Sequence, residues 1–170
     1  MNNPTRSQTK QGHDSDQQQN VLVLGWREWV SLPGLGIPAI KAKIDTGART
    51  SALHTFKIEP FSRDGVDYIR FWLHPLRKKT DIELVCEAPL IEKRLVKDSG
   101  GHTEQRYVIR TPLSIGGRTW DIDITLTDRD NMIFRMLIGR TAIDSNHITI
   151  DPSASYLFGR GLGKIYKTKK

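Results

Sequence analysis

The stretch KIDTGARTSAL, residues 43–53, decides how the rest of the chain is interpreted. An apolar, strand-like run ends at Ile44 and is followed directly by the carboxylate of Asp45 and then by Thr46 and Gly47. Glycine at this place lets a backbone N–H approach the carboxylate closely, and the threonine hydroxyl can form a hydrogen bond to a neighbouring copy of the loop. The pattern fits either a surface turn or one half of a reactive carboxylate site.

The composition indicates a single basic domain. The chain has 170 residues, which suits one domain, and its formal net charge of +7 favours an acidic partner, either a carboxylate-rich peptide or nucleic acid. The one cysteine, Cys86, cannot form an internal disulfide, and no apolar run approaches the ~20 residues of a membrane helix. We therefore expect a cytoplasmic protein with no membrane segment.

Short alternating runs separated by turn residues predict an all-β closed barrel or sandwich with one short helix after Gly139. The polar, glutamine-rich residues 1–20 are predicted to be disordered, residues 21–160 to form the domain, and residues 161–170 to form a basic, fraying tail. The predicted strands are 21–30, 37–44, 52–58, 66–73, 82–86, 90–96, 105–109, 119–126 and 134–138.

Metal and nucleotide chemistry have no support in the sequence. None of the five histidines stands three to five residues from another, and no glycine-rich loop precedes a Lys-Ser or Lys-Thr pair. We expect no metal and no cofactor. Cys86 lies in a strand-like run and is predicted to be a core residue rather than a nucleophile. The tryptophans that alternate with charged residues fit a nucleic-acid surface or the rim of a barrel core, and we favour the rim.

A second motif, RMLIGRTAI, follows at residues 135–143, where two apolar residues precede Gly139. Together the two motifs resemble the retropepsin family of aspartic proteases, in which an apolar strand ends in D-T-G-A and a later apolar-apolar-Gly-Arg strand opens a short helix. Both occur here in that order, at 45–48 and 137–140. The resemblance covers roughly 26–151 and implies a closed retropepsin-like barrel.

A narrower resemblance concerns the runs FWLHP and LTDRDNMIFRMLIGR and the long insertion before the second motif. These are similar to a bacterial family of small retropepsin-like proteins often described as ATP-dependent zinc proteases. Some members are linked to the ribosomal-protein glutamate ligase and trim poly-glutamate tails from a small-subunit ribosomal protein. The resemblance implies an acidic substrate of this kind, whereas the zinc and ATP of the description find no support here.

An aspartic protease uses two carboxylates that share a proton, one of which takes a proton from the attacking water. This chain carries one good motif, so the resemblance implies a catalytic loop of Asp45, Thr46 and Gly47 from each of two chains in a homodimer. The sequence 98–100, Asp-Ser-Gly, is rejected as a second motif because no apolar strand precedes it. It fits a hairpin turn better, at the tip of a flap spanning 90–110.

One departure from the family pattern concerns specificity. Arg49 stands where relatives carry an aspartate that pairs with the arginine of the later motif, here Arg140, and Lys43 lies on the strand face of the catalytic carboxylate. Clustered cations suit an anionic substrate, unless the arginines pair with acids such as Asp144 or Glu59. The predicted substrate contacts are Lys43, Ala48, Arg49, Arg140, Gly100 and Gly101.

The sequence thus predicts a homodimeric aspartic endopeptidase that cleaves acidic, poly-glutamate peptides. The first alternative is a catalytically silent barrel that binds an acidic peptide or ribosomal RNA, and the second is a peptidase of unrelated specificity.

Overall fold

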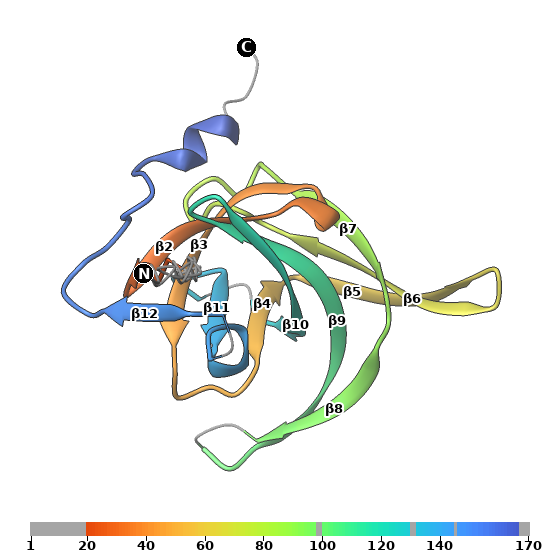
Figure 1. Ribbon diagram of the computed structural model, residues 1–170. Helices are drawn as coiled ribbons and strands as arrows, with labels where there is room; N and C mark the ends of the chain where they lie inside the picture. The colour runs from red at the N-terminus through yellow and green to blue at the C-terminus, as the bar shows by residue number, and fades with distance from the viewer. Residues whose placement is uncertain (1–19, 98–99, 130–131, 145, 167–170) are drawn as a thin grey trace, which may run out of the picture.

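The computed structural model describes residues 20–97, 100–129, 132–144 and 146–166 (Figure 1). The predicted disordered tail, apart from Asn20, lies outside these residues, as does the predicted turn at Asp98 and Ser99. The strands are β1 (Leu22–Gly25), β2 (Arg27–Leu32), β3 (Ile37–Asp45), β4 (Ser51–Thr55), β5 (Lys57–Arg63), β6 (Val66–Leu73), β7 (Leu84–Pro89), β8 (Glu92–Lys97), β9 (Thr103–Ile115), β10 (Arg118–Asp128), β11 (Met136–Gly139) and β12 (Ile148–Asp151). Three short 3₁₀ helices are η1 (Pro33–Leu35), η2 (Arg140–Ala142) and η3 (Leu162–Tyr166).

Six strands close into a mixed barrel. Their order is β10, β4, β11, β3, β2 and β9, and β9 pairs again with β10 to complete the ring. The period-two pattern of β3 explains why it forms a wall: Ile40, Ala42 and Ile44 point into the core, while Lys41 and Lys43 are exposed on the outer face. The predicted all-β closed barrel is confirmed.

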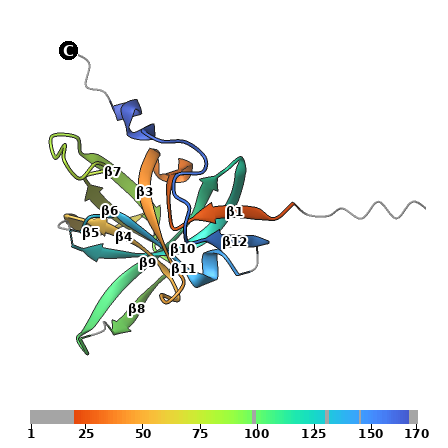
Figure 2. The ribbon, with the colours of Figure 1, turned by 90° about the vertical axis from the view of Figure 1, so that its left-hand side faces the viewer.

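The predicted strand 21–30 is wrong in one respect, because it divides at Trp26 into β1 and β2. The side chain of Glu28, in what reads as an apolar run, is completely buried, and its carboxylate accepts hydrogen bonds from the backbone N–H groups of Gly25 at 3.0 Å and Leu157 at 2.6 Å. β1 lies outside the barrel and pairs in parallel with β12. Figure 2 shows these two strands side by side on one flank of the molecule.

Two further expectations change in detail. The predicted strand 52–58 is interrupted at Phe56, so that β4 stays in the barrel while β5 enters a separate sheet. The short helix expected after Gly139 is present as η2, a single turn of 3₁₀ helix. Since η2 is so short, its value to the fold lies in where it places its backbone N–H groups rather than in helix stability.

The insertion forms a three-stranded antiparallel sheet of β5, β6 and β7 that packs on the barrel core. Phe71 and Cys86 face this core and are buried. Burial raises the pKa of the Cys86 thiol to about 12, so the prediction of a core cysteine is confirmed. No helix of the described residues is long and apolar enough to cross a membrane.

The segment after β12 wraps back over β2 and β3 and ends in η3. The Tyr166 hydroxyl accepts a hydrogen bond from the Ala39 N–H at 3.1 Å and donates one to the Ala39 carbonyl. Gly163 lies so close to Trp29 that an added Cβ would come within 2.7 Å of the indole ring. The predicted basic tail is therefore packed against the barrel as far as Tyr166, where fraying was expected.

Candidate functional site

The two sequence motifs meet at one end of the barrel. β11 runs parallel to β3, and their register places Gly139 opposite Asp45 and Ile138 opposite Ile44. Asp45 is therefore the last residue of a barrel strand, and the residues after it form a surface loop before β4 begins. We call residues 45–50 the Asp45 loop.

The Asp45 carboxylate is held by its own loop. Its Oδ1 atom accepts hydrogen bonds from the backbone N–H groups of Gly47 at 3.1 Å and Ala48 at 3.3 Å. No other hydrogen bond to this carboxylate is formed within the described residues. Asp45 is half-exposed, and Thr46 and Gly47 are exposed.

The start of η2 braces the Asp45 loop from the other side. The N–H groups of Arg140 and Thr141 donate to the carbonyls of Ala48 at 2.8 Å and Arg49 at 3.0 Å. The Arg140 guanidinium also donates to the Thr46 carbonyl at 3.2 Å. Arg140, which was predicted to contact substrate, thus fixes the backbone of the loop.

Gly139 leaves no room for a side chain. A Cβ built on it would lie 2.5 Å from the Thr50 carbonyl carbon, and its N–H donates to the Ser51 hydroxyl at 3.0 Å. Ser51 is fully buried and was missed in the sequence, although a hydroxyl directly after the D-T-G-A-R-T run was a usable signal. Through these contacts the backbone at Gly139 packs directly against the backbone at Thr50 and Ser51.

The basic residues predicted beside the carboxylate are present on the outer surface. Lys43 and Arg49 are exposed, and no ion pair joins either of them, or Arg140, to a carboxylate of the described residues. Within the described residues, Arg49 and Arg140 thus form no ion pair with Asp144 or Glu59. Glu59 instead pairs with Lys57 of its own strand at 3.2 Å.

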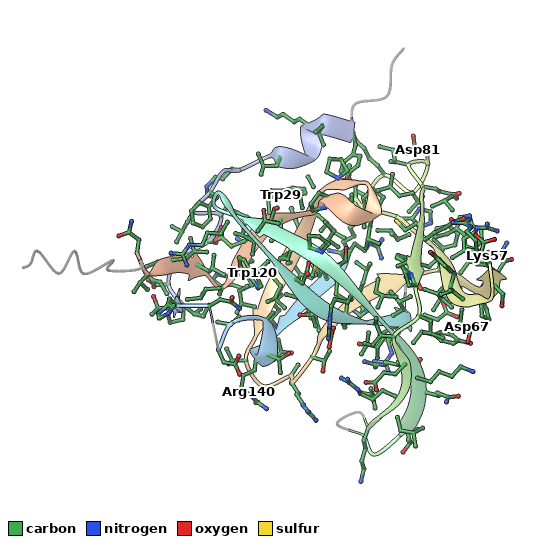
Figure 3. The ribbon with its side chains drawn as sticks, turned by 45° about the vertical axis from the view of Figure 1, so that its right-hand side comes forward. Trp29, Lys57, Asp67, Asp81, Trp120 and Arg140 are labelled. Atoms are coloured by element: carbon green, nitrogen blue, oxygen red, sulfur yellow. The ribbon has the colours of Figure 1, made fainter. Side chains whose placement is uncertain are left out.

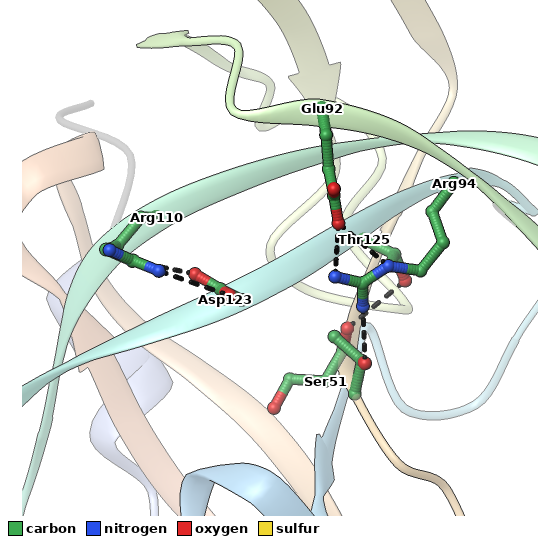
Figure 4. A network of polar contacts seen from close by, with 7 residues as sticks. Ser51, Glu92, Arg94, Arg110, Asp123 and Thr125 are labelled. Carbon is green, nitrogen blue, oxygen red and sulfur yellow. Dashed lines mark hydrogen bonds and ion pairs between the residues drawn. The ribbon is translucent and has the colours of Figure 1, made fainter.

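The segment predicted to be a flap forms the β8–β9 hairpin, which reaches the Asp45 loop. Gly100 and Gly101 lie in its turn, and Gly101 has a φ of +84°, which glycine adopts without strain. Arg94 of β8 donates to the Thr50 hydroxyl at 2.9 Å, while Glu92 holds the same guanidinium (Figure 4). Sequence reasoning missed this contact because it depends on the β8–β9 register.

The described histidines of the barrel region are core residues. Nδ1 of His54 is 2.6 Å from the hydroxyl of Thr127, and the His74 ring stacks on Phe56 with the ring centroids 4.4 Å apart. Within the described part of the chain, no three His, Cys, Asp or Glu side chains lie together as a metal-binding group.

The sequence matches the family described as "RimB-like: Retropepsin-like aspartic endopeptidase RimB" over residues 23–160. The chain belongs to this family. The family recognised from the two motifs is thus confirmed, and the match spans both the Asp45 loop and β11.

Relatives of this RimB-like chain carry another name. It is 45% identical over 140 residues to a "Probable alpha-L-glutamate ligase" of Shewanella pealeana, covering 82% of this chain and 30% of the relative. A protein of the same name from Parasynechococcus marenigrum is 47% identical over 138 residues, covering 81% and 29%. The chain therefore spans about 30% of the length of these relatives.

A solved structure shares the fold. The protein Lpg0085 of Legionella pneumophila, described as of unknown function, superposes with a TM-score of 0.68 at 26% identity, covering 81% of this chain and 98% of that one. The barrel described above is thus shared by a protein of similar extent.

Proposed function

We propose that the protein is an aspartic endopeptidase that cleaves acidic, poly-glutamate peptide segments, such as the tail of a glutamate-tailed ribosomal protein. The observation that carries this proposal is the Asp45 loop, where a strand-end carboxylate is fixed by two backbone N–H groups. Thr46 and Gly47 complete the catalytic loop. Membership of a retropepsin-like aspartic endopeptidase family supports the reaction class.

The second carboxylate of the dyad comes from a second copy of the chain. Peptide hydrolysis by this mechanism needs one carboxylate as base for the water and one protonated carboxyl group as donor to the scissile carbonyl. Thr46 and Gly47 are exposed, so the same loop of a partner can approach them about a two-fold axis. A homodimer then places two copies of Asp45 across the axis.

The acidic substrate follows from the charge around the loop. Lys43 and Arg49 have no acidic partner among the described residues, and Ala48 stands next to Arg49 in the loop. Arg140 adds a third cation while bracing the loop, and the hairpin turn that contains Gly100 and Gly101 covers the bound peptide. The relatives' name, a glutamate ligase, points to glutamate chemistry in the same proteins.

The test uses Asp45→Asn, which keeps the shape of the side chain but removes the base. We expect cleavage of a ten-residue oligo-glutamate peptide, followed by mass spectrometry, to fall by about 10²–10⁴-fold, while the fold and dimer persist. Asp81→Asn, at an exposed turn, is the matched control and should cleave like wild type.

Mixing the two proteins tests the shared dyad. If each site needs Asp45 from both chains, activity after subunit exchange should follow the square of the wild-type fraction. A linear dependence would show that each chain acts alone. Tight binding of the acidic peptide without any cleavage by wild type would instead favour the silent binding barrel, and the same result with RNA would favour its nucleic-acid form.

A further inference from the structure

A pocket of about 420 Å³, with largely apolar walls and several basic lining residues, lies on the outer side of β2 and β3, and we call it the basic pocket. Trp29, Phe134 and Tyr156 supply aromatic walls. In Figure 3, Trp29 lies toward one end of the barrel, and Arg140, beside the Asp45 loop, lies toward the other. The pocket is thus separate from the Asp45 loop. Its basic lining residues include Arg27, Lys41, Arg77, Lys78, Lys79 and Lys164.

Six basic side chains at this pocket have no acidic partner among the described residues. No carboxylate contributes to its lining, and none of those six residues forms an ion pair with a described residue. Moreover, the Nε atom of Arg27 is buried without a hydrogen-bond partner in the described part of the chain. A buried donor left without a partner costs free energy.

The aromatic rings are already in contact with cations. Arg27 lies over the rings of Trp26 at 4.5 Å and Tyr156 at 4.8 Å, and Lys41 lies over Trp29 at 5.3 Å. These contacts hold the charged groups in place while leaving their N–H donors directed elsewhere. Cations already lie over the rings of Trp29 and Tyr156, which leaves less ring surface for stacking nucleobases and favours carboxylates over nucleic acid.

The outer face of β3 connects the pocket to the Asp45 loop. Lys41, Lys43 and Asp45 alternate along this face, and Trp29 and Arg27 of β2 pair with Lys41 and Lys43. At a rise of ~3.3 Å per residue, Lys41 and Asp45 are about 13 Å apart, the length of roughly four extended residues. A basic track therefore leads from the pocket to the candidate catalytic carboxylate.

We propose that the basic pocket is a second binding site for the acidic polypeptide, which grips carboxylates about four or more residues away from the segment that meets Asp45. This proposal rests on the proposed function for the choice of substrate. A long acidic chain would fill both sites, and a short one could fill only one. The pocket thereby selects for long glutamate tails.

The test measures binding without cleavage. Full-length Asp45→Asn protein is titrated against fluorescein-labelled peptides of ten and four glutamates, and the anisotropy gives Kd. Replacing Arg77, Lys78 and Lys79 together by alanine, at exposed loop positions, should raise the Kd of the ten-residue peptide at least tenfold. Lys41→Ala should raise it about three- to tenfold. The ratio between the two peptides should fall toward one in both variants.

Lys57→Ala is the matched control. Lys57 also lies over a tryptophan, with its Nζ 4.4 Å from the centroid of Trp72, but on β5 and outside the pocket. The control removes the same charge and should leave the Kd within twofold of the parent. An equal loss in Lys57→Ala and Lys41→Ala would reduce the effect to net charge and overturn the proposal.

The outcomes separate this inference from the proposed function. Pocket-dependent binding of the long peptide by a protein that cleaves nothing would support the second site while the peptidase proposal fails. Cleavage with unchanged Kd in the pocket variants would overturn the second site alone. Failure of the ten-residue peptide to bind would overturn it too. So would tighter, pocket-dependent binding of a ten-nucleotide polyuridine, because the site would then belong to nucleic acid.

Discussion

The Asp45 loop and the β8–β9 hairpin lie against each other but are held in different ways. The loop is fixed by backbone hydrogen bonds from η2 and by the close approach of Gly139. The hairpin has no buried residue in β8, and β8 pairs only with β9 among the described strands. Figure 1 shows the hairpin extending past the barrel on the side of the Asp45 loop.

The difference separates two tasks of a site. A carboxylate that shares a proton must be positioned to a fraction of an ångström, which backbone contacts provide. A cover over a cleft must open, and a two-stranded ribbon with exposed hydrogen bonds opens at low cost. The hydrogen bond from Arg94 to Thr50 then joins the fixed loop to the hairpin, which we expect to move.

The largest expected contrast is in amide hydrogen exchange. The N–H groups of Arg140 and Thr141, bonded to the loop carbonyls, should exchange at least about a hundredfold more slowly than those of β8, because they require opening of the barrel. Exchange followed by mass spectrometry on short peptides measures both. Equal protection of the two regions would remove the distinction.

Gly139→Ala tests the rigid side. The added Cβ would meet the Thr50 backbone at 2.5 Å, which cannot relax by rotation of a side chain. We expect a loss of about 3 kcal/mol in unfolding free energy and a Tm lower by roughly 6–12 °C, together with loss of peptide cleavage. Thermal unfolding followed by circular dichroism checks this, and a Tm within 2 °C of wild type would contradict it.

Arg94→Ala tests the hydrogen bond that connects the β8–β9 hairpin to the Asp45 loop. Losing the Thr50 hydrogen bond should raise KM for an acidic peptide about three- to tenfold, consistent with about 1 kcal/mol, because the hairpin closes less often. The Tm should stay within about 2 °C, since exposed ion pairs such as Arg94–Glu92 contribute little. Arg110→Ala, whose partner is Asp123 at 2.8 Å, is the control that touches no loop residue (Figure 4).

If Arg94→Ala and Arg110→Ala change KM equally, the Arg94–Thr50 hydrogen bond has no special role in substrate binding. Thr50→Val gives a second route to the same answer, because it removes the acceptor and keeps the arginine.

The smallest effect is expected for Gly101→Ala. Its φ of +84° disfavours alanine by about 1 kcal/mol, but nothing lies within 4 Å of the new methyl group. Since the hairpin opens locally, the Tm should fall by less than about 2 °C. A larger fall than that of Gly139→Ala would mean that the hairpin, rather than the loop, is the rigid part.

Much of the candidate site was predictable because its signals are local. The alternation of Ile40, Ala42 and Ile44 placed Asp45 at a strand end, and the glycine before Arg140 marked the partner strand. Backbone geometry alone then brings the two motifs together, since each strand has one face that must be buried.

Other parts depend on contacts that no local pattern records. Glu28 in an apolar run would be expected at the surface, yet a backbone N–H at Leu157, distant in sequence, satisfies its buried carboxylate. The basic pocket draws on residues from Arg27 to Lys164, so only the folded chain assembles it. The Arg94–Thr50 bond likewise depends on strand register.

The one cysteine of the chain, Cys86, is buried, and its reactivity can report on opening of the inserted sheet. Cys86 belongs to β7 of the inserted sheet, and its thiol, with a pKa of about 12, is almost entirely protonated at pH 8. Only about one thiol in ten thousand is then the reactive thiolate, and burial blocks access as well. Alkylation by iodoacetamide should therefore count the moments at which the inserted sheet separates from the barrel. The alkylation rate of Cys86 therefore measures how often the two sheets separate, and no label has to be introduced into the chain.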